Sequence, residues 1–290
     1  MSYGSNGPNA PAVALSDSLW SGIIREKVFG RNIDRQYGIG LCDDFNAFGP
    51  CAAISTAAAW FQSNGISYLG YIDSDAGVMA TPGIHVAVPT TTPAVDANGP
   101  SAIVLTPDND DNDCVILQAG GGVQTPFNVI RATAGLLVYE TRFKVSAITA
   151  SCTDLFIGLG GTGACANSGV QTDDSATLAS NNFLGFTRKA ATTSGLTFTA
   201  QRVGGTEQEH ADVGTLVADT YIKAGFRFDP LTKVCGVWIN GVLKHQVTAA
   251  QTALTPWPTL FMNFIAEMKY QATAAHGLYI DWWACAQLAT

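Results

Sequence analysis

Residues 221–247, YIKAGFRFDPLTKVCGVWINGVLKHQV, decide the fold class of this chain. Apolar residues at positions 222, 224, 226 and 228 alternate with other residues, which is the period of two of a half-buried β-strand. Asp229-Pro230 favours a turn because the proline ring presets φ, and Asn240-Gly241 tolerates the positive φ of a type I′ hairpin turn. The stretch therefore predicts three antiparallel strands in an all-β protein.

The same alternation continues on both sides of this stretch. Residues 135–148 form the longest predicted strand, and residues 260–268 and 278–288 form the two predicted strands that close the chain. Further strands are expected at 67–72, 84–88, 102–106, 114–118, 154–159, 183–187, 196–202 and 213–217. About a dozen short strands predict one β-sandwich domain over residues 41–290, made of two antiparallel sheets packed face to face.

Three local predictions concern details of this sandwich. At its start, Phe45 is expected in the core, as is Phe48, beside exposed carboxylates at Asp43 and Asp44. At its end, the even-numbered residues 278–288, Trp282 included, are expected to share one face of the last strand. Between them, the Gly-, Ser- and Thr-rich residues 160–182 are expected to form a long irregular loop.

The first 40 residues are predicted to be an N-terminal arm rather than part of the sandwich. Gly, Pro, Asn and Ala dominate residues 1–15, and a short helix is expected over about residues 17–29, with apolar side chains at helical spacing. Its apolar stripe requires a partner surface, either the body of the same chain or a neighbouring subunit. The predicted partner-binding residues are Leu19, Trp20, Ile23, Ile24, Arg25 and Val28.

Composition restricts the partners of the chain. Charged residues make up 13% of the 290 residues, about half the usual share, and the net charge is -8. A weakly charged surface is typical of a protein that packs against neighbours, and an acidic chain without clustered Lys and Arg is not expected to bind nucleic acid. The sequence shows neither a signal-peptide pattern nor an apolar run of about 18 residues, so no membrane insertion is expected.

The seven cysteines do not form a recognisable site. They are scattered without C-x-x-C spacing and without histidines at ligand spacing, which excludes a zinc motif. An odd number fits a complete disulfide framework poorly, so most are expected to be buried free thiols made in a reducing compartment, with a bridge between one pair left open.

The acidic run at 108–113, DNDDND, is the strongest candidate metal site. Oxygen ligands at alternating positions suit Ca²⁺, and the candidate ligands are Asp108, Asp110 and Asp113. The run lacks the glycine and the glutamate of an EF-hand loop, so a solvated turn is favoured. Neither a metal nor any other cofactor is predicted.

Catalytic signals are equally weak. Glu207 and Glu209 are spaced like a carboxylate pair but are expected to be exposed loop residues. Asp281 beside two tryptophans suits a sugar site, although a core tryptophan with an outward Asp explains it as well. The four histidines are scattered, and Trp257 is expected either in the core or in a binding loop. No catalytic residue is predicted.

The order of the patterned strands resembles a known family. The segments are VYETRFKVSAI (138–148), FIGLG (156–160), FLGF (183–186), AGFRFDPLTKVCGVWINGVL (224–243) and LYIDWW (278–283). They resemble the concanavalin A-like jelly roll, laminin-G-like domains included. With the low charge and the Ala/Thr/Gly bias, the chain looks like a virion protein of tailed bacteriophages, of the capsid decoration or head-stabilising type. Glucanases of the superfamily carry an E-x-D-x-x-E strand, which this sequence lacks.

Three functions follow as expectations from this resemblance. The first is a non-enzymatic, homo-oligomeric virion component, made in the host cytoplasm and bound to the major capsid protein or other virion subunits through the arm and loops. The second is a carbohydrate-binding module of a phage fibre or receptor-binding protein that recognises surface glycans. The third is a divergent glycoside hydrolase.

Overall fold

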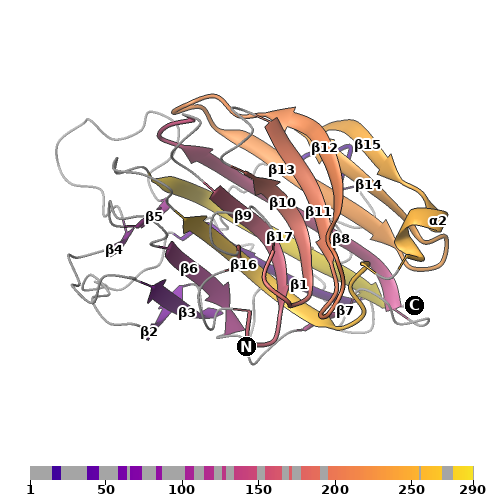
Figure 1. Ribbon diagram of the computed structural model, residues 1–290, viewed down its shortest axis with the longest axis horizontal. Helices are drawn as coiled ribbons and strands as arrows, with labels where there is room; N and C mark the ends of the chain where they lie inside the picture. The colour runs from indigo at the N-terminus through magenta and orange to yellow at the C-terminus, as the bar shows by residue number, and fades with distance from the viewer. Residues whose placement is uncertain are drawn as a thin grey trace, which may run out of the picture.

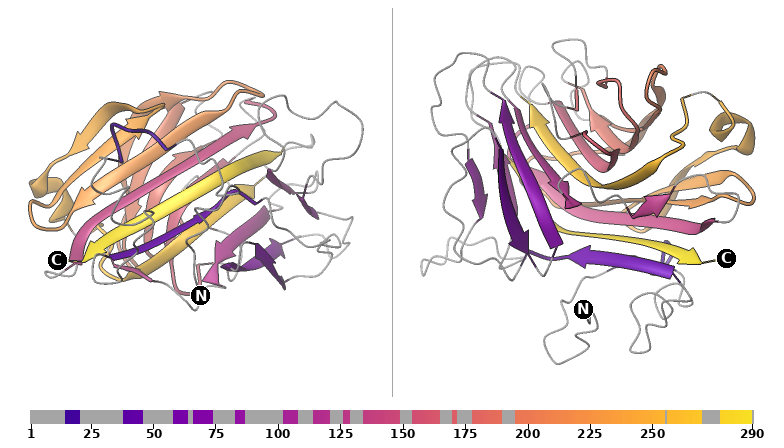
Figure 2. Two further views of the ribbon diagram at one scale, coloured as in Figure 1. Left: turned by 180° about the vertical axis from the view of Figure 1, so that it is seen from behind. Right: turned by 90° about the horizontal axis from the view of Figure 1, so that it is seen from below.

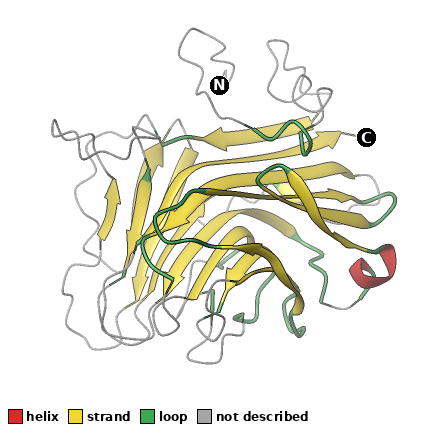
Figure 3. Cartoon of the chain, turned by 90° about the horizontal axis from the view of Figure 1, so that it is seen from above, coloured by secondary structure: helices red, strands yellow, loops and turns green. Residues whose placement is uncertain are grey.

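The chain folds into two antiparallel β-sheets. The computed structural model describes residues 15–20, 38–45, 58–63, 66–73, 83–86, 102–107, 114–120, 126–128, 134–148, 154–164, 170–171, 178–189, 195–254, 256–269 and 277–289. Figure 3 shows these residues as strands and connecting loops, with one short helix. The elements are β1 (Gly38–Asp43), β2 (Ala58–Ser63), β3 (Ile66–Asp73), β4 (Gly83–Val86), β5 (Ile103–Thr106), β6 (Cys114–Ala119), β7 (Phe127–Asn128), β8 (Ala134–Val145), β9 (Asp154–Gly161), β10 (Phe183–Arg188), β11 (Gly195–Gln201), β12 (Gln208–Thr215), β13 (Ile222–Asp229), β14 (Val234–Ile239), β15 (Val242–Val247), α2 (Ala249–Thr252), β16 (Phe261–Lys269) and β17 (Leu278–Ala289) (Figure 1).

The strands divide into an eight-stranded and a nine-stranded sheet. The eight-stranded sheet has the order β15-β14-β13-β8-β17-β5-β4, with β1 also paired to β17. The nine-stranded sheet has the order β12-β11-β10-β9-β16-β6-β3-β2, with β7 also paired to β16. Figure 2 shows the two sheets as two layers, with the long strands β8 and β17 side by side in one of them. The prediction of a sandwich of two antiparallel sheets is confirmed.

The predicted meander is present as strands β13, β14 and β15. Its alternating apolar residues, including Phe226 and Val237, are buried in the core. Asn240 has a φ of 50° and Gly241 a φ of 77°, as the type I′ turn requires. The turn after Asp229 is wider than predicted, because the Lys233 N–H donates to the Asp229 carbonyl and Lys233 itself takes a positive φ of 57°.

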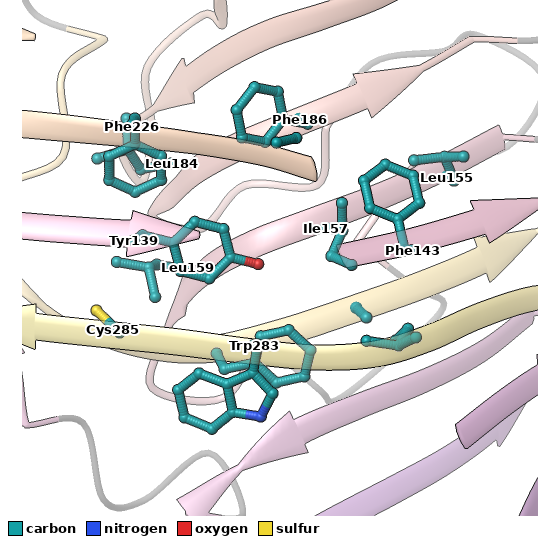
Figure 4. Close-up of a cluster of buried hydrophobic side chains, with 14 of the residues drawn as sticks. Tyr139, Phe143, Leu155, Ile157, Leu159, Leu184, Phe186, Phe226, Trp283 and Cys285 are labelled. Carbon is teal, nitrogen blue, oxygen red and sulfur yellow. The ribbon is translucent and has the colours of Figure 1, made fainter. Parts of the chain in front are cut away.

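The main core lies between the two sheets. In Figure 4, side chains from β8, β13 and β17 face side chains from β9 and β10. Aromatic rings pack closely here: the Tyr139 and Phe226 rings stack at 5.2 Å between centroids, and the Phe264 and Trp283 rings stack at 4.7 Å. Burial of this apolar surface is the main force that holds the two layers together.

One strand departs from its predicted alternation. The register of β17 against β8 shifts between Ile280 and Trp282, as at a β-bulge. Ile280 and Trp283 therefore both lie in the main core, whereas Trp282 lies in a separate apolar cluster on the outer face of the eight-stranded sheet. The prediction that the even-numbered residues 278–288 share one face is wrong after Ile280, because the extra residue of a bulge reverses the facing of those that follow.

Asp43 is buried, not exposed as predicted. Its carboxylate accepts hydrogen bonds from the Tyr68 hydroxyl at 2.7 Å and from the Phe45 N–H at 2.8 Å. The Tyr68 hydroxyl in turn accepts from Trp283 Nε1 at 2.8 Å. Asp44 is also buried, and Phe45 lies in the core as expected, while Phe48 is outside the described residues. A buried carboxylate is tolerated here because both of its oxygens accept hydrogen bonds.

The cysteines that the structure describes are free thiols: Cys42, Cys114, Cys235 and Cys285. Burial is the main cause that raises the pKa of Cys42, to about 12, and the nearby carboxylate of Asp43 adds to it. Cys114, Cys235 and Cys285 are buried and Cys42 is half-buried, which agrees with the expectation of mostly buried free thiols. Within the same described part of the chain, no helix is long and apolar enough to cross a membrane.

Candidate functional site

Residues 15–20 of the predicted arm pack on the outer face of the eight-stranded sheet. The Ser16 carbonyl accepts hydrogen bonds from the Leu19 and Trp20 N–H groups, which forms one compact turn. Leu19 and Trp20 are buried in an apolar cluster with Val138, Trp282, Ala284 and Ala286. For these two residues the partner surface is thus the body of the same chain, one of the two alternatives left open by the sequence.

Glu140 fixes this turn to β8. One of its oxygens, Oε2, accepts from the Ser16 N–H at 3.0 Å and from Trp20 Nε1 at 2.9 Å. Burial raises the pKa of Glu140 above its ordinary value, and the hydrogen bonds from Ser16 and Trp20 oppose that rise. Gly225 makes room for Leu19, because a Cβ on Gly225 would stand 2.5 Å from Leu19 Cδ2.

The other predicted arm residues, Ile23, Ile24, Arg25 and Val28, lie outside the described residues, as does most of the predicted helix. Their role as a partner-binding surface stays a prediction. The metal candidates Asp108, Asp110 and Asp113 also lie outside that part of the chain. Within it, no group of three or more His, Cys, Asp or Glu side chains could hold a metal ion.

The outer face of the nine-stranded sheet carries a second apolar cluster. It is formed by Cys114, Ile116, Phe156, Phe183 and Ile265 from four neighbouring strands, together with Ala164, Val170 and Leu178. The last three belong to the predicted loop of residues 160–182, where Gln171 and Leu178 pair as an isolated β-bridge. Residues 170–171 and 178–179, here called the covering bridge, thus seal this face with the chain's own side chains.

Glu267 and Lys269 anchor the covering bridge from β16. Glu267 Oε2 accepts from the Gln171 N–H at 2.9 Å, and Lys269 Nζ donates to the Gln171 carbonyl at 3.3 Å. Both side chains are buried, as is Asp154, which lies opposite Lys269 on β9. Burial raises the pKa of Glu267 to about 8, while the charge of Lys269 and backbone hydrogen bonds oppose the rise.

Glu267 is not among the predicted site residues, although the sequence carries a signal for it. The strand FMNFIAEMK is apolar on one face and carries Phe261 and Ile265 on the face of its glutamate, which is typical of a strand buried on both sides. A glutamate in such a strand must find partners within the protein. A titratable carboxyl with a raised pKa is also what a general acid needs, but a substrate cannot reach Glu267 while the covering bridge lies over it.

Glu207 and Glu209 both form ion pairs with Lys189. Lys189 Nζ lies 2.7 Å from Glu207 Oε1 and also contacts Glu209 Oε1. The second Glu207 oxygen accepts from the Leu178 N–H at 3.2 Å, so Glu207 also supports the covering bridge. The prediction that both glutamates lie in a loop is wrong for Glu209, which belongs to β12, because irregular pairing and the positive φ of Asp212 break the alternation there.

Two of the scattered histidines meet across the edge of the sandwich. His210 on β12 and His245 on β15 come from the edge strands of the two sheets, and His245 Nε2 lies 3.0 Å from His210 Nδ1. Burial lowers the pKa of His210, and the neighbouring His245 adds to that effect. No local pattern could predict this contact between residues 35 positions apart.

Large apolar side chains are exposed in two segments, the turn between β13 and β14 and the residues from α2 to the start of β16. Leu231 lies in the turn between β13 and β14, while Leu254, Leu260 and Phe261 lie between α2 and the start of β16. Thr252 Oγ1 donates to the Lys233 carbonyl at 2.6 Å and so ties the two segments together. These four residues, here called the apolar rim, are 43% to 73% exposed.

Trp257 holds the apolar rim in place. It is buried, and its ring lies 5.2 Å from that of Phe228 in the core, so the core alternative predicted for this residue is the correct one. The residues around Asp281 do not form the sugar site considered from the sequence. Trp283 lies in the core, Trp282 packs with Leu19 and Trp20, and Asp281 pairs with Arg142.

Comparison with known proteins supports the fold and nothing finer. No protein-family model and no curated protein matches the sequence. Among solved structures, an endo-1,3-beta-glucanase from Streptomyces sioyaensis is similar over 86% of this chain and 96% of its own, with a TM-score of 0.51 and 14% identity. A protein of unknown function from Shewanella oneidensis MR-1 is similar over 88% of each chain, with a TM-score of 0.50 and 12% identity.

A weaker likeness is to the binding domain of botulinum neurotoxin DC, solved in complex with rat synaptotagmin II. It covers 77% of this chain but 44% of that one, with a TM-score of 0.45 and 11% identity. At these identities the similarity is one of fold, and function must be argued from this chain's own residues.

Proposed function

We propose that this chain is a non-enzymatic binding and assembly module that attaches to a larger particle through its apolar rim. The observation that carries the proposal is the set of four exposed apolar side chains in two segments that the Thr252–Lys233 hydrogen bond joins. Large apolar side chains that protrude from two segments tied together are typical of a surface that a partner covers. Burial of such surface contributes about 25 cal/mol per Å² before the costs of association.

The setting that we propose is the surface of a virion capsid, with the major capsid protein or another virion subunit as the partner. The support is the resemblance in sequence to phage decoration proteins and the low share of charged residues. Because Leu19 and Trp20 are buried on the chain's own sheet, the rim offers a better surface for attachment than these two arm residues do.

The positions of four carboxylates support the proposal that the chain is not an enzyme. Glu267 and Asp154 lie buried on neighbouring strands, with the covering bridge bound to Glu267, and Glu207 and Glu209 share Lys189. A glycosidase needs two carboxyl groups open to a sugar and to water.

Attachment is tested by co-sedimentation with purified particles. Phe261→Asp places a charge in the rim and is expected to reduce the amount of bound protein by at least about tenfold, equal to about 1.4 kcal/mol. Val217→Asp is the control, because Val217 is also exposed, at 54% against 43% for Phe261, but precedes the other end of β13. Unchanged binding of Phe261→Asp to the particle would sink the role of the rim.

Carbohydrate binding is a second candidate function. It is favoured by half-exposed tyrosines, Tyr221 and Tyr279, on the outer face of the eight-stranded sheet, since aromatic side chains with a polar tip are common in sugar sites. A glycan array probed with the full chain tests this candidate, and an array without a binder above background would remove it.

A further inference from the structure

Two histidines link the edge strands of the two sheets. β15 ends the eight-stranded sheet and β12 ends the nine-stranded sheet, and the two strands contact each other (Figure 1). Both strands are described throughout, and they form no backbone ladder with each other. Instead, His245 Nε2 on β15 lies 3.0 Å from His210 Nδ1 on β12, with 4.6 Å between the ring centroids. A contact between side chains thus joins the two layers at this edge.

The two imidazoles differ in their exposure. His210 is buried and lies opposite Phe198 on β11, with 6.3 Å between the ring centroids. Its second nitrogen, Nε2, is buried without a hydrogen-bond partner among the described residues. His245 is half-buried and lies opposite Val237, a residue of the main core. A proton from solvent therefore reaches His245 more easily than His210, where a new N–H group would have no acceptor.

This contact can hold one added proton but not two. A neutral imidazole has one donor and one acceptor nitrogen, so a protonated His245 can still donate to a neutral His210. When both rings are protonated, every ring nitrogen is a donor and the hydrogen bond between them is lost. Two positive charges then face each other across the 3.0 Å contact. Burial lowers the pKa of His210, and the neighbouring His245 adds to that effect.

The carboxylates on β12 do not compensate for a second positive charge. Glu209 precedes His210, so alternation along the strand places it on the other face, where it pairs with Lys189. Asp212 lies against Gly195, since a Cβ on Gly195 would stand 2.7 Å from Asp212 Oδ1. Among the described residues, neither carboxylate forms an ion pair with His210.

The other strands packed against the pair offer no counter-ion either. β11 and β14 are described throughout and carry no Asp, Glu, Lys or Arg. The buried thiol of Cys235 on β14 stays neutral, because burial raises its pKa. On β15 the charged neighbour of His245 is Lys244, which is exposed and has the same sign as an imidazolium. A doubly protonated pair is therefore unstable in the closed contact.

We propose that the His210–His245 contact is an acid-sensitive clasp, which holds β12 against β15 at neutral pH and opens when both imidazoles are protonated. In the open form each ring meets water and takes up its own proton near pH 6.5. The closed form then binds one proton fewer, so each pH unit below about 6.5 shifts the equilibrium toward opening by up to about tenfold. The clasp is thus closed above this pH and weakens as the pH falls. Its failure would leave attachment through the apolar rim untouched.

Hydrogen exchange of the full chain at pH 7.5 and pH 5 tests the proposal, with rates corrected for intrinsic exchange at each pH. Peptides from β12 and β15 are expected to lose protection by about fivefold to 30-fold at pH 5, whereas β8 and β17 in the middle of their sheet are not. The lower limit of pH 5 keeps ordinary carboxylates ionised.

Three variants assign the effect to the histidine pair. His245→Gln keeps a polar side chain that does not titrate and can accept from His210, so it is expected to reduce the loss of protection to less than about twofold. His210→Gln removes the buried partner and should have the same result. Lys244→Gln, at the exposed position beside His245, is the control and should keep the full response of the wild type.

Each result decides the matter. A loss of protection confined to β12 and β15, present in Lys244→Gln and absent in His245→Gln, supports the clasp. Equal protection of these strands at both pH values, or a full response in His245→Gln, overturns it. A uniform loss over all strands would also overturn it, because the whole fold and not this edge would then respond to acid. Thermal melting at pH 7.5 checks that each variant is folded, and the half-buried His245 carries the test if His210→Gln is not.

Discussion

The two outer faces of the sandwich are covered by the chain itself, but to different extents. Over the nine-stranded sheet, the covering bridge buries an apolar cluster together with Glu267 and Lys269. Over the eight-stranded sheet, residues 15–20 bury one apolar cluster, while Arg142 and Lys144 beside it stay half-buried. The outer face of the nine-stranded sheet thus forms a second core, whereas the outer face of the eight-stranded sheet is covered only in part by a short segment.

This difference in cover decides which outer face of the sandwich is open to solvent. In a two-layer sandwich each sheet has one face in the core and one face free. Here the outer face of the nine-stranded sheet is covered by Ala164 and the covering bridge, whereas the outer face of the eight-stranded sheet keeps half-buried cations and tyrosines within reach of solvent. Four predictions test this contrast, in order of decreasing effect.

The largest effect is expected from the second core. Phe183 is fully buried there, with its ring 5.3 Å from that of Phe156. Phe183→Ala should lower the free energy of unfolding by about 3–5 kcal/mol, because it leaves a cavity in addition to the lost burial. Urea unfolding measures the change, with Phe261→Ala, 43% exposed, as the control of the same chemistry. Similar small losses in both variants would mean that the outer face is not a core.

The buried Glu267 should make stability depend on pH. Its pKa is raised from 4.5 to about 8, so the folded state holds a proton that the unfolded state releases across this range. Stability is therefore greatest below about pH 4.5 and falls as the pH rises through about 8, by at most about 1.4 kcal/mol per pH unit. The measured quantity is the difference between the wild type and Glu267→Gln, in which the opposite contribution of His210 cancels. Parallel pH curves for the two proteins would contradict the assignment.

A smaller effect is expected where residues 15–20 cross the eight-stranded sheet. Trp20→Phe keeps most of the ring but removes the donor to Glu140, which should cost about 1.5–3 kcal/mol because the acceptor is a buried carboxyl. Trp257→Phe is the matched control, since Trp257 is equally buried but its Nε1 has no hydrogen-bond partner within the described residues. Chemical denaturation compares the two variants. If Trp257→Phe were the more damaging, the hydrogen bond to Glu140 would not be what fixes the segment.

The smallest effect is expected at the open end of the same sheet. Asp281→Asn breaks the ion pair with Arg142, and because both side chains are partly exposed the cost should stay below about 1 kcal/mol. Urea unfolding of the wild type and the variant measures the change. A loss of stability well above that limit would show that this ion pair is part of the packed structure rather than a surface contact.

The fold could be predicted from the sequence because its signals are local. Alternation in β13 and β14, the Asn240-Gly241 turn and the alternating apolar residues of β16 each depend on a few neighbouring residues. The bulge after Ile280 could not be predicted from local alternation. Whether a residue pairs with the neighbouring strand or is left unpaired depends on that strand, not on the residues beside it in the sequence. That single irregularity moved Trp282 from its predicted face to the opposite one.

The sequence by itself determined that this chain is an all-β sandwich, since burial on one face imposes a period of two wherever a strand forms. Tertiary structure alone decided which faces are covered, because cover comes from remote segments: Gln171 over Glu267, Trp20 over Glu140, Tyr68 on Asp43. It also brought His210 to His245 and placed Lys223 opposite Arg142. A residue's type fixes what it can bind, but its exposure, and hence its role, depends on what the rest of the chain lays over it.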